Sequence, residues 1–111
     1  MWRDDAYLYD ILESARTAIE YTRGKDWDSF SEDILLQDAV VRRLEIIGEA
    51  AGRVSSETQE KYSYLPWHDM RGTRNKIIHE YDSIRLDVIW DIVHKDLPDL
   101  VKELEKIISP E

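Results

Sequence analysis

The chain has 111 residues, of which 42% are apolar and none is cysteine, and its formal net charge is −9. This length suits one compact domain with a modest core, so we expect residues 1–111 to form a single domain. The lack of cysteine excludes disulfide frameworks and thiolate metal sites, and the excess of acid argues against a protein that coats nucleic acid through widespread basic contacts.

The N-terminal segment Met1–Asp5 leads into a charged amphipathic stretch rather than into an apolar signal core. No uninterrupted apolar run approaches the ~18 residues that a membrane span needs. We therefore expect a soluble, unexported protein with a cytoplasmic location and no membrane contact.

Apolar residues at helical spacing predict a first helix from Asp4 to Arg23, which Gly24 can end. Residues 25–32 are interpreted as a connection in which Trp27 and Phe30 cover the core. Both aromatic side chains are expected to pack inside the protein rather than to bind a ligand.

A second, longer helix is predicted from about Asp33 to Val54, with Ser31 or Asp33 as its N-cap. Gly48 lies inside this helix, close to other small residues. A small-residue surface lets another helix approach closely, either within the subunit or between subunits.

The second half of the chain also has helical spacing. Ser55–Glu60 offers capping residues for a short turn, and a third major helix is predicted from Trp67 to about Tyr81. The spacing continues through Ser83–Leu97, and Asp96–Pro98 can restart a final helix. No segment alternates with a two-residue period, so strands are not expected, and the predicted class is all-α, an up-and-down bundle of four or five helices.

The most reactive stretch of the sequence is Trp67–Tyr81. Between Arg71 and His79 it holds three Arg or Lys residues and no acid, although the chain as a whole is acidic. This local reversal of charge predicts an anion site.

On a continuous helix, Arg71, Asn75 and His79 would share one polar stripe, whereas Arg74 would lie about 140° from His79. Arg74 and His79 could then meet only if the helix ends or bends near His79, if Arg74 reaches round, or if a second subunit adds its own copy of the site. Histidine can transfer protons near neutral pH, and an arginine fork can hold a phosphate. Capping or ordinary hydrogen bonding would equally explain a lone histidine near a helix end.

The run Arg74-x4-His79-x-Tyr81 matches, without gaps, the Arg-x4-His-x-Tyr motif of the HepT branch of HEPN proteins. The flanking segments Arg43–Ala50, Pro66–Trp67 and Val88–Val93 also look like that branch. The resemblance therefore covers nearly the whole chain.

The resemblance implies a HEPN homodimer whose two motif helices line a shared cleft. It also implies a metal-independent endoribonuclease without a cofactor, acting as the toxin of a type VII toxin–antitoxin system, with tRNA as one candidate substrate. The expected antitoxin is an MntA-type minimal nucleotidyltransferase that transfers AMP from ATP onto the motif tyrosine.

The same resemblance gives the residues their roles. Arg74 and His79 would be catalytic, Arg71 and Asn75 would bind the RNA substrate, and Tyr81 would receive the AMP group. Glu49 also matches a frequent position of the branch and could orient a motif arginine, but a surface role explains it equally well, so we leave it out of the catalytic set.

Other interpretations remain open. The chain could be a non-catalytic helical module that presents substrate or nucleotide to a nucleotidyltransferase, or a structural dimer in which the motif is a hydrogen-bonding network. A metal site is not expected, because the spacing of His68, His79 and His94 matches no compact ligand pattern. The scattered glycines form no phosphate-binding loop.

Overall fold

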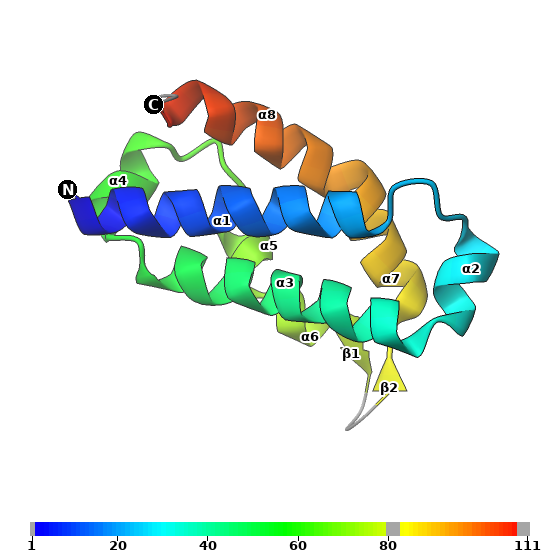
Figure 1. Cartoon of the computed structure of the whole chain (residues 1–111). Coiled ribbons are helices and arrows are strands. Elements are labelled where there is room, and N and C mark those ends of the chain that lie inside the picture. The colour runs from blue at the N-terminus through cyan, green and yellow to red at the C-terminus, as the bar shows by residue number, and fades with distance from the viewer. Residues whose placement is uncertain (1, 80–82, 109–111) are drawn as a thin grey trace.

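The computed structural model describes residues 2–79 and 83–108, and most of them are helical (Figure 1). The elements in chain order are α1 (Trp2–Tyr21), α2 (Trp27–Glu32), α3 (Ile34–Arg53), α4 (Ser56–Lys61), α5 (Trp67–Arg71), α6 (Thr73–Ile77), β1 (Ile78–His79), β2 (Ser83–Ile84), α7 (Leu86–Asp91), the π-helical segment η1 (Ile92–Asp96) and α8 (Leu97–Ile107). The all-α prediction is confirmed. The helical segments outnumber the predicted four or five because several short pieces join the long helices.

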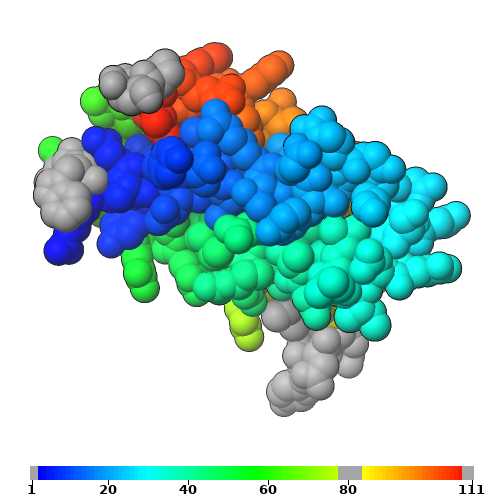
Figure 2. Space-filling model, in the orientation of Figure 1, coloured from blue at the N-terminus to red at the C-terminus, as the bar shows by residue number. Residues whose placement is uncertain are grey.

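The three long helices α1, α3 and α8 form the body of the molecule. α1 runs antiparallel to α3 and lies between α3 and α8 in Figure 1, and it packs mainly against these two helices. Figure 2 shows α1 and α3 side by side as a continuous surface. The apolar stripes that predicted these helices supply the core, which includes Leu8, Ile11, Leu12, Ala15, Val40, Leu44, Ile47, Ala51, Leu100 and Leu104.

The predicted helix boundaries hold where a capping residue marks them. Gly24 follows the end of α1 and has a φ of 74°, a left-handed conformation that favours glycine. Asp33 is the N-cap of α3, and its carboxylate accepts a hydrogen bond from the Leu36 backbone N–H at 3.0 Å. The predicted connection at residues 25–32 instead contains α2, which Asp26 caps by accepting from the Ser29 backbone N–H at 2.9 Å.

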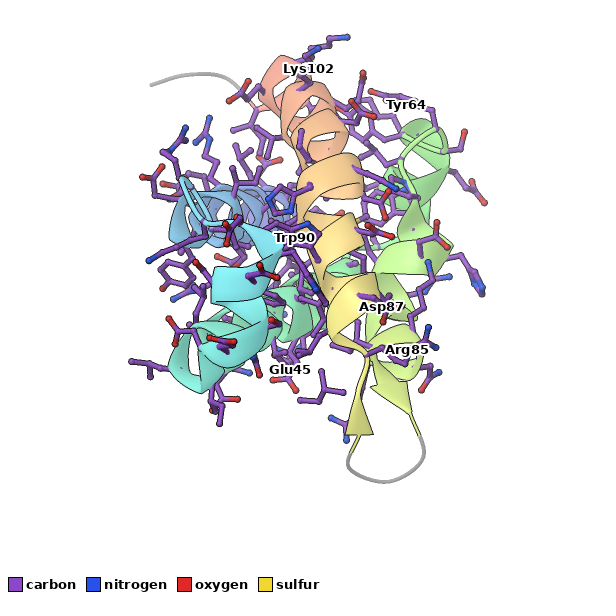
Figure 3. All side chains as sticks on the ribbon, turned by 90° about the vertical axis from the view of Figure 1, so that its right-hand side faces the viewer. Glu45, Tyr64, Arg85, Asp87, Trp90 and Lys102 are labelled. Atoms are coloured by element: carbon purple, nitrogen blue, oxygen red, sulfur yellow. The ribbon has the colours of Figure 1, made fainter. Side chains whose placement is uncertain are left out.

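An aromatic cluster closes the end of the bundle beside α2. The Phe30 side chain is fully buried, and its ring centroid lies 5.2 Å from that of Trp90 and 6.2 Å from that of Trp27. Figure 3 shows Trp90 on the side of α7 that faces α2. Phe30 therefore covers the core as predicted, whereas Trp27 remains 40% exposed and only partly does so.

A buried carboxylate joins the start of α1 to α4. Asp4 is 3% exposed and accepts hydrogen bonds from the Ser55 backbone N–H at 3.0 Å, the Ser55 hydroxyl at 2.6 Å and the Thr58 hydroxyl at 2.6 Å. The hydrogen bonds from the Ser55 and Thr58 side chains hold the pKa of Asp4 below its ordinary value. Ser55 is also the N-cap of α4, as its position predicted.

The prediction that a new helix starts at Asp96–Pro98 is wrong, because the helix does not end before this point. α7, η1 and α8 follow one another without a break and form one continuous helical segment (Figure 1). Proline has no backbone N–H and its ring crowds the carbonyl four residues earlier. The chain accommodates Pro98 with a π-helical turn, in which the Leu97 backbone N–H donates to the Ile92 carbonyl.

The expectation of no strands is also wrong at one place. β1 and β2 form an antiparallel pair in which Ile78 lies opposite Ile84 and His79 lies opposite Ser83. In Figure 1 this pair projects from the helical body beside α6 and α7. Among the described residues, no helix is both long and apolar enough to cross a bilayer.

Candidate active site

The motif segment, residues 67–79, begins as a helix that breaks at Gly72. The Gly72 backbone N–H donates to the His68 carbonyl at 2.9 Å and ends α5, and the Gly72 carbonyl accepts from the backbone N–H groups of Asn75 at 3.0 Å and Lys76 at 3.2 Å as α6 begins. The Thr73 hydroxyl donates to the Asp69 carbonyl at 2.9 Å across the break. α5 and α6 are therefore two short helices rather than one.

The predicted continuous helix from Trp67 to Tyr81 is wrong at its C-terminal end. α6 ends at Ile77, and His79 belongs to β1. The Arg85 backbone N–H donates to the Ile77 carbonyl at 2.6 Å, which fixes this helix end beside the start of α7. The helical angle of about 140° between Arg74 and His79 no longer applies, because the helix ends before His79. A helix end near His79 was one of the three alternatives considered for this segment.

Contact with α3 determines where the motif segment lies. α3 packs against α5 and α6. A Cβ atom added at Gly48 would lie only 3.0 Å from the Met70 carbonyl oxygen. The close approach predicted at Gly48 is thus a contact with α5 within the subunit.

A groove of about 370 Å³ lies between α3 and the motif segment. Its lining consists of Leu44, Glu45, Gly48 and Glu49 from α3, Arg71 from α5, and Thr73 and Arg74 from α6. The structure thus brings two predicted site residues, Arg71 and Arg74, into one groove. Asn75 is exposed on α6 but does not line the groove.

Each groove arginine contacts a polar side chain of a neighbouring helix. Arg74 Nη1 lies 3.8 Å from Glu45 Oε2, and the side chains are 71% and 31% exposed respectively. Arg71 Nη1 donates to Gln59 Oε1 on α4 at 2.8 Å. Exposed ion pairs contribute only about 0–1 kcal/mol to stability, so the Arg74 contact adds little to the stability of the fold.

The other basic residues near the motif are also paired. Lys76 Nζ lies 3.0 Å from Asp69 Oδ1, and neither residue lines this groove. Arg85 Nη2 lies 3.3 Å from Asp87 Oδ2 just after β2, and Arg85 lowers the pKa of Asp87 through this contact. Both Arg85 and Asp87 are labelled in Figure 3.

A second hollow of about 330 Å³ lies on the α8 side of α6. Its lining is mostly apolar, and its charged groups are chiefly acids, namely Asp69, Asp96, Asp99 and Glu103, with Lys76 as the one base. These charges would repel a phosphate, so the groove that holds Arg71 and Arg74 fits an anion better.

Two of the predicted site residues cannot be placed in the groove. The backbone of His79 is described as part of β1. Tyr81 lies outside the described residues, between β1 and β2. Within residues 2–79 and 83–108, no three His, Asp or Glu side chains converge as they would at a metal site.

A family model described as ribonuclease HepT-like matches residues 11–107. The chain belongs to the HepT-like ribonuclease family. A Methanocaldococcus jannaschii protein named "Putative RNase MJ1380" is 44% identical over 100 residues, which cover 90% of this chain and 92% of that protein. A Caldanaerobacter subterraneus protein named "Putative RNase TTE0752" is 39% identical over 105 residues, covering 95% of this chain and 94% of the relative.

A third relative of this HepT-like chain, from Thermococcus cleftensis, is named "Probable ribonuclease HepT". It is 37% identical over 101 residues, which cover 91% of this chain and 92% of the relative. No solved structure matches the HepT-like chain significantly. The family assignment therefore depends on sequence similarity, which extends over nearly the full length of this chain and of each of these relatives.

Sequence reasoning missed the side chains that contact the two arginines of the HepT-like groove. It considered Glu49 as the acid that could orient a motif arginine, but the acid that contacts Arg74 is Glu45, four residues earlier on α3. Residues four apart on a helix share one face, so the spacing of Glu45 and Glu49 could have identified both as possible partners of a motif arginine. Gln59, the partner of Arg71, had no comparable signal because it lies on a separate short helix.

Proposed function

We propose that this chain is a metal-independent endoribonuclease that acts as a toxin in a type VII toxin–antitoxin system. The observation that carries this proposal is the groove that contains Arg71 and Arg74, on a family member whose motif is intact from Arg74 to Tyr81. An acidic protein needs such a local concentration of arginine to hold an RNA phosphate.

The proposed reaction is an internal transfer at phosphorus. His79 takes the proton from an RNA 2′-hydroxyl, the 2′-oxygen bonds to phosphorus, and the bond from phosphorus to the 5′-oxygen breaks. A histidine then protonates the departing 5′-oxygen, which leaves a 2′,3′-cyclic phosphate. Arg74 stabilises the charge that develops on the phosphorus oxygens, while Arg71 and Asn75 bind flanking parts of the RNA.

A second copy of the chain would complete this site. In the proposed homodimer, the motif segments of both copies line one cleft, so that one His79 could act as base and the other as acid. Ile34 and Leu35 at the start of α3 are 71% and 80% exposed, and pairing is one way to cover such apolar side chains.

Control of the toxin is proposed to act through Tyr81. An MntA-type minimal nucleotidyltransferase would transfer AMP from ATP onto the tyrosine hydroxyl and release pyrophosphate. The added phosphodiester and base would place negative charge and bulk two residues from His79, where the RNA phosphate must bind. Inhibition would then need no refolding of the chain.

Cell growth and the integrity of total RNA test this function most broadly. Expression of the wild type alone should stop growth and fragment RNA. Expression of His79→Ala, or of the wild type together with an MntA-type minimal nucleotidyltransferase, should leave growth and RNA intact. Mass spectrometry of the co-expressed protein should show AMP on Tyr81.

One observation favours a non-catalytic role for the same residues. The hydrogen bond from Arg71 to Gln59 and the ion pair between Arg74 and Glu45 could simply join α4, α5 and α6 to α3. That interpretation predicts normal growth and intact RNA for the wild type alone, for His79→Ala and for the co-expressed wild type. It also requires that the His79→Ala protein is shown to be folded.

A further inference from the structure

Glu45 is the acidic side chain that meets the motif arginine. We propose that Glu45 is a positioning residue, which orients the Arg74 guanidinium toward the RNA phosphate. This inference rests on the proposed ribonuclease function, in which Arg74 stabilises the phosphate. The Arg-x4-His-x-Tyr motif does not include Glu45.

The two partners differ in how firmly the protein holds them. Glu45 lies in the middle of α3, next to Leu44, which is 1% exposed, and its own side chain is 31% exposed. Arg74 extends from the short helix α6, and its side chain is 71% exposed. The carboxylate is thus the fixed member of the pair, and the long arginine side chain is the member that gains order from the contact.

The contact leaves the rest of the arginine available. Arg74 Nη1 faces Glu45, whereas a guanidinium has further N–H donors on Nη2 and Nε. Those donors suit the bidentate geometry in which arginine binds phosphate. A guanidinium held at one nitrogen is therefore prepared to bind RNA with the others.

The charge of Glu45 is outweighed within its own group of ion pairs. Glu45 Oε1 also lies 3.6 Å from Arg42 Nη1, one turn earlier on α3. Two guanidinium groups thus share one carboxylate, and the cluster of Arg42, Glu45 and Arg74 keeps a net positive charge. Figure 3 shows Glu45 on the same half of the molecule as β1, which contains the backbone of His79.

Glu49 provides a matched comparison on the same helix. It lines the same groove and is exposed, but no ion pair joins it to Arg74 among the described residues. Glu49→Gln therefore removes one negative charge from the groove without touching Arg74. Asp38→Asn removes a charge seven residues before Glu45, on an exposed part of α3 outside the groove lining, and controls for net charge.

The test combines steady-state cleavage of bulk tRNA with a direct measurement on the arginine. We expect Glu45→Gln to lower kcat about tenfold and to leave KM unchanged or lower, since orientation is lost while a repelling charge is removed. Glu49→Gln should lower KM alone, and Asp38→Asn should match the wild type. Urea unfolding midpoints should agree among all four proteins.

The second readout is the heteronuclear NOE of the Arg74 Nε–H group, assigned by its disappearance in Arg74→Lys. The NOE should fall in Glu45→Gln and stay unchanged in Glu49→Gln. If Glu45→Gln and Glu49→Gln change the kinetics alike, or if the Arg74 signal is equally mobile with and without Glu45, the positioning role is refuted. If the wild type cleaves no RNA, the ribonuclease proposal fails and the NOE alone decides whether Glu45 holds Arg74.

Discussion

Replacing Gly48 with alanine tests whether the contact between α3 and α5 determines the position of the motif segment. The new Cβ would lie 3.0 Å from the Met70 carbonyl oxygen. That oxygen belongs to the backbone, so it cannot rotate away as a flexible side chain would. α5 must therefore shift by a few tenths of an ångström, and α6 with Arg74 follows it after Gly72.

Gly52→Ala on the same helix is the control, because no atom lies within 4 Å of the added Cβ. We expect Gly52→Ala to be neutral or stabilising by up to about 1 kcal/mol, the helix propensity gained over glycine. Overpacking costs about 1–3 kcal/mol, so Gly48→Ala should be less stable than Gly52→Ala by about that amount.

Urea unfolding followed by circular dichroism measures both free energies of unfolding. RNA cleavage by the two variants, measured under native conditions, should fall only for Gly48→Ala. A Gly48→Ala protein as stable as Gly52→Ala would show that α5 yields freely, and the proposed link between this contact and the site would be refuted.

Two further changes test the packing and electrostatics of the fold. Asp4→Asn should destabilise the protein near neutral pH. Because the pKa of Asp4 is lowered in the folded protein, the carboxylate stabilises the fold above pH 3.8, its ordinary pKa, and this stabilisation is lost as the pH falls through and below that value. The difference in unfolding free energy between Asp4→Asn and the wild type should therefore shrink in acid. A difference that does not change with pH would contradict this. Phe30→Ala should lower the free energy of unfolding by about 3–5 kcal/mol, and by clearly more than Trp27→Ala, because only Phe30 is fully buried. Equal losses in urea titrations of the two variants would refute that account.

The sequence predicted the long helices well because their boundaries and faces are local properties. The stripes at Leu8–Ala15 and Val40–Ala51 became the core, and Gly24 and Asp33 mark helix ends through backbone conformation and capping. α2 was missed because six residues are too few for periodicity to reveal, and its cap at Asp26 stands in a stretch of several polar residues.

The end of the motif helix could not be predicted from local pattern. Ile77 and Ile78 are both apolar and continue a helical spacing, yet α6 ends between them. The change comes from partners further along the chain, since Ile78 pairs with Ile84 and the Ile77 carbonyl accepts from Arg85. The choice of Glu45 over Glu49 likewise depends on where α6 crosses α3, which spacing alone does not determine.

The measurement that tests the central claim most directly is cleavage of purified RNA by the purified chain in the presence of EDTA. The wild type should cleave and leave 2′,3′-cyclic phosphate ends, while Arg74→Ala and His79→Ala, shown to be folded, should lose nearly all activity. Cleavage that needs an added divalent ion, or that survives both substitutions, would contradict a metal-independent reaction carried by Arg74 and His79.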